Sequence, residues 1–103
     1  YSKAHTGMDI AVSTGTPIHA CADGTVTLAS MYGGFGNCVI INHGNGLTSL
    51  YGHNSSLRVV RGQKVKRGQV IARAGSTGFS TGPHCHFQIT LHGQLKNPMK
   101  YLR

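Results

Sequence analysis

Two histidines, His84 and His86, flank Cys85 in the last quarter of the chain. Side chains alternate along a β-strand, so residues two apart project from the same face of a sheet. In a strand the two imidazoles would point one way and Cys85 the other. Imidazole is a common metal ligand and titrates near neutral pH. The pair therefore indicates a metal or catalytic site, although two surface histidines would give the same pattern.

A second cluster near the N-terminus places His5 four residues before Asp9. Gly7 and the apolar run that begins at Met8 favour a loop entering a strand over a helix, so the two side chains must converge through a turn. Two imidazoles and one carboxylate form a ligand set of catalytic zinc sites, with the fourth position left to water. Asp9 taken alone is typical of an ordinary turn or cap residue.

Acidic residues are scarce, because Asp9 and Asp23 are the only ones and there is no Glu. A glycosidase needs a pair of carboxylates, and Asp23 precedes Gly24 in a predicted tight turn, where Asp serves local hydrogen bonding. The His-Glu-x-x-His signature of other zinc proteases is excluded. If the reaction is hydrolysis, the base must be a histidine or a bound hydroxide.

His53 follows a predicted strand and is the candidate for a catalytic imidazole that does not bind metal. A solvated loop histidine fits the same position equally well. The other three histidines have no partner at an informative spacing and are predicted to be structural or surface residues, with His43 bonding its own turn; they are His19, His43 and His92.

The three cysteines, Cys21, Cys38 and Cys85, cannot all pair, and none lies in a Cys-x-x-Cys motif. A disulfide framework and a thiolate zinc site are therefore disfavoured. Cys21 and Cys38 both fall in predicted strands and are the pair to test for one disulfide, with small buried apolar residues as the alternative. A cysteine nucleophile is disfavoured, because alternation turns Cys85 away from the histidines.

The net charge is +8, from ten Lys and Arg against two Asp. Such a charge attracts polyanions, among them anionic wall polymers, nucleic acid and anionic lipid. Basic residues are dense only in 58–73, which holds no aromatic residue for stacking on bases. Specific nucleic-acid binding is therefore disfavoured.

Length and composition predict one all-β domain over residues 1–103, an antiparallel sheet shaped like an open barrel or sandwich. Asp23-Gly24 and Asn45-Gly46 are predicted hairpin turns, and 75–83 a surface loop beside a site. No segment has the length of a membrane span. The predicted strands are 8–12, 18–22, 25–31, 38–42, 47–51, 69–74 and 86–91, with a short edge strand at 57–60.

With these clusters in place, the chain resembles the lysostaphin-type zinc metallopeptidases, also called the LytM family, over nearly its whole length. Many ordered motifs carry the resemblance, which makes coincidence implausible. They are His5-Thr-Gly-Met-Asp9, Gly15-Thr-Pro-Ile-His-Ala20, Asp23-Gly24-Thr-Val26, Gly36-Asn-Cys-Val-Ile-Ile-Asn-His43-Gly-Asn-Gly46, Tyr51-Gly-His53, Val65-Lys-Arg-Gly68-Gln-Val-Ile71, Gly75-Ser-Thr-Gly78 and Ser80-Thr-Gly-Pro-His84-Cys-His86-Phe.

The resemblance implies that His5, Asp9 and His86 bind zinc in a groove of the sheet, and that His53 and His84 are the metal-free catalytic pair. It implies a monomeric endopeptidase that cuts stem or bridge peptides of bacterial peptidoglycan, acting as a secreted, envelope or phage-virion protein. The chain departs from the family pattern at Cys85, where Leu is usual, and at Gln88, where Glu is common. The sequence also lacks the upstream segment that usually begins the sheet, so we expect a processed or excised piece of a longer protein.

Two alternatives belong to other classes. The first is a family member that has lost activity and serves as a binding or regulatory module of the envelope, although all five site residues are present here. The second is a lipoyl- or biotinyl-like carrier or adaptor barrel, suggested by the stretch 65–71. Met99-Lys100 resembles the lysine of such carriers but lies at the chain end instead of in a central hairpin.

Overall fold

The computed structural model describes residues 2–4, 7–77 and 82–96, with side chains from Ile10 onward. One short 3-10 helix, η1 (Gly33–Phe35), is the sole helical element in these ranges, and no helix there is long and apolar enough to cross a membrane. The strands are β1 (Ser2–Ala4), β2 (Gly7–Ala11), β3 (Pro17–His19), β4 (Gly24–Met31), β5 (Asn37–Gly44), β6 (Leu47–Leu57), β7 (Lys64–Val65), β8 (Val70–Ala74), β9 (His84–Leu91) and β10 (Gln94–Lys96).

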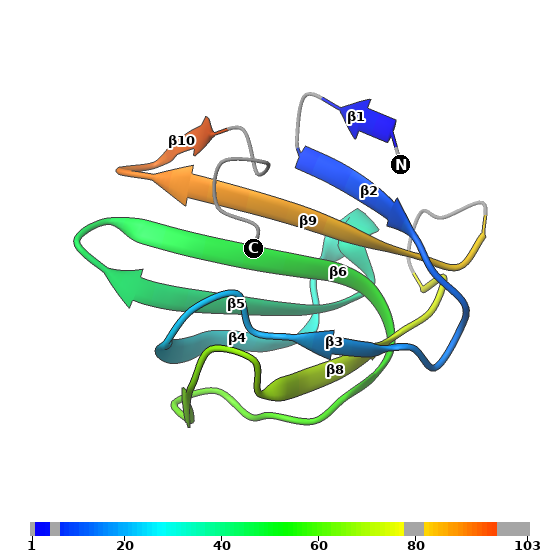
Figure 1. The fold of residues 1–103 in the computed structure, drawn as a ribbon, viewed down its shortest axis with the longest axis horizontal. Coiled ribbons are helices and arrows are strands. Elements are labelled where there is room, and N and C mark those ends of the chain that lie inside the picture. The colour runs from blue at the N-terminus through cyan, green and yellow to red at the C-terminus, as the bar shows by residue number, and fades with distance from the viewer. Residues whose placement is uncertain (1, 5–6, 78–81, 97–103) are drawn as a thin grey trace.

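The strands form one open sheet in the order β1-β2-β9-β6-β5-β4-β7 (Figure 1). β10 pairs with β9, and β3 pairs with β8, which in turn pairs with the end of β6. Every pairing is antiparallel, which confirms the predicted all-β antiparallel class.

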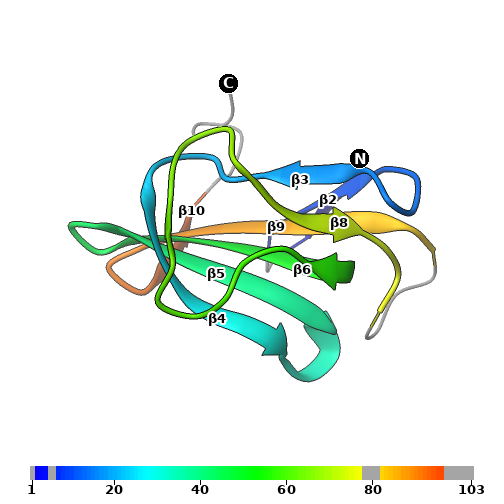
Figure 2. The same ribbon diagram turned by 90° about the horizontal axis from the view of Figure 1, so that it is seen from below.

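The hydrophobic core lies between the long strands and a second layer made by β3 and β8 (Figure 2). Alternate residues supply it: Cys85, Phe87 and Ile89 are buried from β9, and Val39 and Ile41 from β5. Burial of each such side chain contributes roughly 1.5–3 kcal/mol. One face of β9 therefore packs in the core, and the opposite face carries His84 and His86.

The Asn45-Gly46 hairpin prediction is confirmed. The two residues join β5 to β6 with φ of 53° and 81°, the left-handed conformations of a type I′ turn. Gly and Asn accept these angles most readily, which explains why this dipeptide fixes the register of the two central strands.

The Asp23-Gly24 hairpin prediction is wrong, because β3 pairs with β8 whereas β4 pairs with β5 and β7. The Asp23 side chain instead accepts a hydrogen bond from the backbone N–H of Arg67 at 2.7 Å. Asp23 thus connects the segment between β3 and β4 to the segment between β7 and β8.

Two predicted strand ranges also need correction. The strand predicted at 18–22 ends at His19, after a register shift beside Ile18, and the Cys21 backbone N–H donates to Tyr51 Oη instead of to a ladder. The edge strand predicted at 57–60 is absent: β6 ends at Leu57 and the chain then enters a turn in which Gln63 N–H donates to Val60 O. The short strands β1, β7 and β10 were not predicted.

We predict that Gly75→Ala destabilises the fold, because an added Cβ would lie 2.6 Å from the backbone N and 2.9 Å from the Cα of Ser55. Overpacking of this kind costs about 1–3 kcal/mol, and each kcal/mol lowers the melting temperature by about 4–8 °C in a domain of this size. Thermal unfolding followed by circular dichroism measures the shift. The control is Ser76→Ala at the exposed neighbouring position. A Gly75→Ala melting temperature equal to that of the control would contradict the prediction.

Candidate functional site

A bulge in β6 changes the face on which its side chains lie. The ladder pairs Val39 with Tyr51 but Asn37 with Asn54, so β6 carries one residue more than β5 across this step. His53 lies in the bulge with φ of 64°, a left-handed conformation that few non-glycine residues adopt. Bulges re-aim side chains. Tyr51 consequently belongs to the core cluster, whereas His53 joins a group of rings on the opposite face.

Three imidazoles meet on that face. The ring centroid of His53 lies 4.7 Å from that of His84 and 6.0 Å from that of His86. His53 and His86 are only 6% and 5% exposed, so both rings are largely removed from water. The alternation predicted for β9 holds, since Cys85 belongs to the core cluster behind these rings.

Phe35, from η1, covers two of the three histidines and was not found from the sequence. Its ring centroid lies 5.3 Å from that of His86 and 6.4 Å from that of His53. Gly52, paired with His86 in the ladder, makes room for it: a Cβ at position 52 would lie 3.3 Å from Phe35. A glycine inside a strand marks such a close approach, and this is the signal that could have revealed the contact.

Backbone carbonyls fix the tautomers of His53 and His84. His53 Nδ1 lies 2.6 Å from the carbonyl oxygen of Thr77, and His84 Nδ1 lies 2.9 Å from that of Gly82. A carbonyl oxygen only accepts hydrogen bonds, so each Nδ1 must carry a proton and donate it. In the neutral ring, Nε2 then holds the lone pair. Both histidines can therefore accept a proton at Nε2.

His86 has the opposite arrangement. Its Nε2 lies 2.9 Å from Oε1 of Gln88, an amide oxygen that only accepts, so Nε2 carries the proton and Nδ1 holds the lone pair. Metal-binding histidines usually donate their second N–H to such an oxygen, which fixes the ring for the metal. The geometry of His86 thus fits a metal ligand at Nδ1.

The segment after β8 is held in place by Thr77. Its Oγ1 donates to the carbonyl oxygen of Asn54 at 2.7 Å and accepts from the backbone N–H of Asn37 at 3.0 Å. The carbonyl that orients His53 is thereby tied to β5 and β6. Part of the loop predicted at 75–83 therefore lies at the site, while its residues 78–81 fall outside the described residues.

The two remaining predicted ligands are only partly described. The backbone of Asp9 in β2 pairs directly with that of His86 in β9. His5 lies outside the described residues. Among the side chains that the structure describes, no group of three His, Cys, Asp or Glu residues is placed to hold a metal ion. The side chains of His5 and Asp9 are not among those described, so this absence does not extend to them.

The histidines assigned no catalytic role make structural contacts. His43 does not bond its own turn: its Nδ1 donates to the Asp23 carbonyl oxygen at 2.7 Å, and its Nε2 lies 2.7 Å from Ser49 Oγ. His19 Nδ1 donates to the Gly68 carbonyl oxygen at 2.8 Å. These bonds connect loops behind the site.

The disulfide considered between Cys21 and Cys38 is not formed, and all three cysteines are free thiols. Cys38 is fully buried on one face of β5, whereas Cys21 contacts Tyr51, which lies over the other face. The sheet itself separates the two sulfurs. The alternative of buried cysteines is confirmed for Cys38 and Cys85, while Cys21 is only half-buried.

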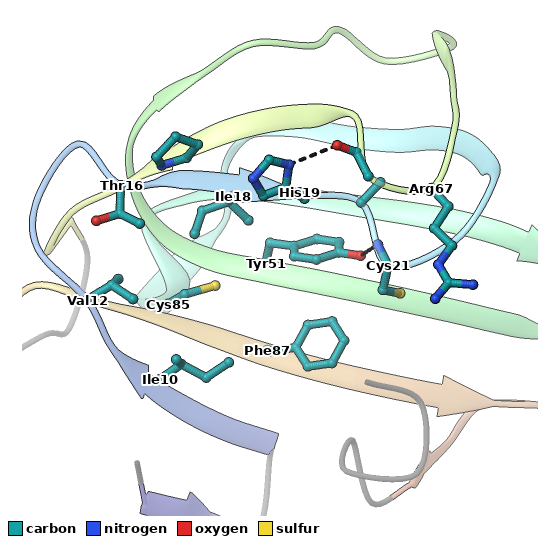
Figure 3. Close-up of a pocket in the computed structure, with 13 residues that line it drawn as sticks. Ile10, Val12, Thr16, Ile18, His19, Cys21, Tyr51, Arg67, Cys85 and Phe87 are labelled. Atoms are coloured by element: carbon teal, nitrogen blue, oxygen red, sulfur yellow. Dashed lines mark hydrogen bonds between the residues drawn. The ribbon is translucent and has the colours of Figure 1, made fainter. Parts of the chain in front are cut away.

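An open pocket of about 350 Å³ lies behind the site, between the β2-β9-β6 strands and β3 (Figure 3). Cys85 and Phe87 point into it, and these residues alternate along β9 with the site histidines. The pocket is thus distinct from the face that carries the three imidazoles.

Comparison with known proteins places this arrangement in a family. Residues 3–98 match the model of peptidase family M23. The chain is 46% identical over 97 residues to the DD-carboxypeptidase/endopeptidase Mpg of Neisseria meningitidis, covering 94% of this chain and 22% of that protein. It is 45% identical over 96 residues to the murein hydrolase activator EnvC of Escherichia coli, covering 93% and 23%. The chain thus spans about a fifth of the length of these curated relatives.

Solved structures also share the fold. The catalytic domain of the antimicrobial peptidase lysostaphin from Staphylococcus simulans superposes with a TM-score of 0.89 at 35% identity, covering 94% of this chain and 77% of that one. A zinc-containing peptidase from Vibrio cholerae gives a TM-score of 0.89 at 38% identity, covering 92% and 29%. These matches leave the carrier-barrel alternative without support, and its Lys100 lies outside the described residues. By sequence and by fold, the chain belongs to peptidase family M23.

Proposed function

We propose that this chain is the catalytic part of a zinc endopeptidase that hydrolyses peptide bonds of bacterial peptidoglycan. The observation that carries the proposal is the meeting of three imidazoles with two different nitrogen arrangements. His53 and His84 have the lone pair at Nε2, and His86 has it at Nδ1. One site thus combines two groups suited to proton transfer with one suited to metal binding.

We assign the metal to His5, Asp9 and His86. The direct backbone pairing of Asp9 with His86 supports this set, because residues opposite each other on adjacent strands lie about 4.5–5.5 Å apart. The hydrogen bond from His86 to Gln88 supports the ligand role of Nδ1. Bound zinc would act as a Lewis acid, polarising the scissile carbonyl and lowering the pKa of water toward about 7.

His53 and His84 carry the proton transfers in this proposal. One neutral ring accepts the proton of the attacking water at Nε2. The other ring, protonated at Nε2 as an imidazolium, stabilises the oxyanion or protonates the leaving amine. Their rings are adjacent, and both Nδ1 protons are held by carbonyl oxygens, so neither ring can turn without losing a hydrogen bond. Phe35 helps to exclude water around His53 and His86.

The substrate class rests on the relatives. Mpg is a carboxypeptidase and endopeptidase of the DD type by name, and lysostaphin is an antimicrobial peptidase. The name of Mpg supports DD bonds of the stem peptide as one substrate class, bridge-peptide bonds are the class that the family resemblance adds, and we propose action in the envelope or outside the cell. The net charge of +8 suits a wall that carries anionic polymers.

A regulatory module is the second candidate, favoured by the 45% identity to EnvC, a murein hydrolase activator by name. An activator needs the fold but no proton-transfer groups. The three buried or half-buried histidines with fixed tautomers favour the enzyme.

Incubation with purified cell walls distinguishes the two candidates. We expect new amino ends to appear in walls with either glycine cross-bridges or direct stem cross-links, and a chelator to abolish their release because the metal is lost. Labelling and mass spectrometry of the new amino ends identify the bond. Release of no amino end from either wall by the zinc-loaded chain would support the regulatory module.

Alanine substitution separates the two groups of residues. We expect His53→Ala and His84→Ala to lower turnover by about 100-fold or more while zinc stays bound, because a general acid or base contributes about 10²–10⁴-fold. We expect His5→Ala, Asp9→Ala and His86→Ala to lose zinc, measured by elemental analysis. His19→Ala is the control and should change neither. Full zinc content in His86→Ala would contradict the assignment.

Gln88 should set the zinc affinity through His86. Gln88→Leu removes the acceptor of the Nε2 proton and should weaken zinc binding about 10–100-fold, whereas Gln88→Glu should bind at least as tightly as the natural chain. Titration against a competing zinc indicator measures both. The matched control is Gln94→Leu, at an exposed position in β10. Equal affinity of Gln88→Leu and this control would show that the contact does not orient the ligand.

A further inference from the structure

A second group of titratable side chains lies on the opposite face of β6 from the proposed active site. Cys21 Sγ lies 3.8 Å from His43 Nε2, which also lies 2.7 Å from Ser49 Oγ. Ser49 Oγ in turn donates to Tyr51 Oη at 2.8 Å, and Tyr51 Oη accepts the backbone N–H of Cys21 at 3.0 Å. The side chains of His43, Ser49 and Tyr51 therefore form a network that begins at the Cys21 thiol and ends at the Cys21 backbone N–H, and none of them belongs to the proposed zinc site.

The network is arranged for a charged pair. His43 Nδ1 faces the Asp23 carbonyl oxygen at 2.7 Å and must carry a proton there. Because Ser49 donates to Tyr51, its oxygen can accept a hydrogen bond from His43 Nε2, which then carries a proton as well. His43 is thus placed as an imidazolium beside the sulfur, the arrangement that stabilises a thiolate in reactive cysteines.

The pKa directions agree with this geometry. Burial acts to raise the pKa of Cys21, but hydrogen bonds from His43, Tyr51 and Ser49, with the charge of His43, bring it below its ordinary value. Burial acts to lower the pKa of His43, but its bonds to Cys21 and to the Asp23 carbonyl, and the charges of both residues, raise it. Thiol and imidazole shift toward their ionised forms together.

The other two cysteines are internal controls. Cys38 is fully buried, and burial raises its pKa to about 12. Cys85 is 4% exposed and packs in the core cluster. The raised pKa keeps the Cys38 thiol protonated and unreactive near neutral pH. Cys85 also lines the pocket, so what sets Cys21 apart from the other two thiols is its greater exposure and its contact with the His43 imidazole.

The pocket behind β9 gives Cys21 room for a small molecule. Cys21 and Tyr51 line it together with the apolar side chains Ile18 and Phe87. Arg67 lies at the same end as Cys21 (Figure 3). Among the side chains that the structure describes, Asp23 is the acid near this end, and it accepts a hydrogen bond from the Arg67 backbone N–H at 2.7 Å. The pocket thus combines a nucleophilic sulfur, an apolar wall and an exposed guanidinium.

We propose that Cys21 is a modification site that undergoes thiol–disulfide exchange with small disulfides bearing a carboxylate. The Cys21 thiolate attacks one sulfur of the disulfide R–S–S–R, a bond forms between Cys21 Sγ and that sulfur, and R–S⁻ leaves with the electron pair of the broken S–S bond. Cys21 is oxidised to a mixed disulfide, and the leaving sulfur is reduced to a thiolate that takes a proton from water below its own pKa. Arg67 binds the carboxylate of the group retained in the pocket.

The test is the reaction of the folded 103-residue chain with 5,5′-dithiobis(2-nitrobenzoate), a disulfide with two carboxylates that releases a coloured thiolate. We expect one fast equivalent per chain at pH 6, mapped to Cys21 by peptide mass spectrometry. Its rate should exceed by at least about tenfold that of the thiols in the chain unfolded by guanidinium at the same pH, because an ordinary thiol has a pKa near 8.5 and is almost wholly protonated there.

Variants identify the partners. His43→Gln keeps a hydrogen-bonding side chain without the charge and should slow the fast phase at pH 6 by about tenfold, with thermal unfolding to confirm that the variant is folded. Arg67→Ala should slow the dianionic disulfide but not 2,2′-dithiodipyridine, which is neutral. Arg61→Ala removes the same charge from an exposed position outside the pocket and is the matched control.

Three results would overturn the proposal. One is a folded chain whose Cys21 reacts no faster at pH 6 than the thiols of the unfolded chain, a comparison that needs no variant. Another is a fast equivalent that maps to Cys38 or Cys85. The third is a folded His43→Gln chain with an unchanged rate.

Discussion

The bulge at Gly52 and His53 is the constraint on which the site depends. In a regular strand, Tyr51 and His53 would share a face, and either the tyrosine would leave the core or the histidine would enter it. One extra residue in β6, and a left-handed backbone at His53, let the strand place an aromatic ring in the core and an imidazole on the opposite face. Such a conformation costs about 1–3 kcal/mol and persists only where its surroundings hold it. Here the Thr77 carbonyl and the rings of His84 and Phe35 do so.

The three site histidines are chemically identical but differ in which ring nitrogen donates a hydrogen bond. The ring centroids of His84 and His86 lie 4.7 Å and 6.0 Å from that of His53, and the sequence neighbours of the three histidines alone do not distinguish them. What distinguishes them is the oxygen that each N–H meets: a loop carbonyl for His53 and His84, and the Gln88 amide for His86. A neutral amide acceptor polarises the His86 ring less than a carboxylate would. If His86 binds metal as proposed, Gln88 is the position at which the metal affinity would be tuned without changing a ligand.

Much of the architecture could be predicted from local patterns. The alternation around His84 and His86, and the Asn45-Gly46 turn, depend on neighbouring residues alone, and both predictions hold. The Asp23-Gly24 turn failed because its partner, Arg67, is 44 residues away. The loop 75–83 was predicted beside a site, but the contacts of Thr77 and Phe35 were not predicted, because their partners Asn37 and His86 lie far away in the sequence. The ligand roles of His5 and Asp9 stay predictions.

The pairing of Asp9 with His86 joins positions 77 residues apart, and Thr77 joins the site to Asn37 across 40 residues. Contacts so distant along the chain form late, after most of the loop-closure entropy has been lost. A chain still emerging from the ribosome, or threaded unfolded through a membrane, would therefore hold neither the proposed ligand set nor the oriented imidazoles. Under the proposed function, hydrolytic capacity would appear only once the sheet has closed.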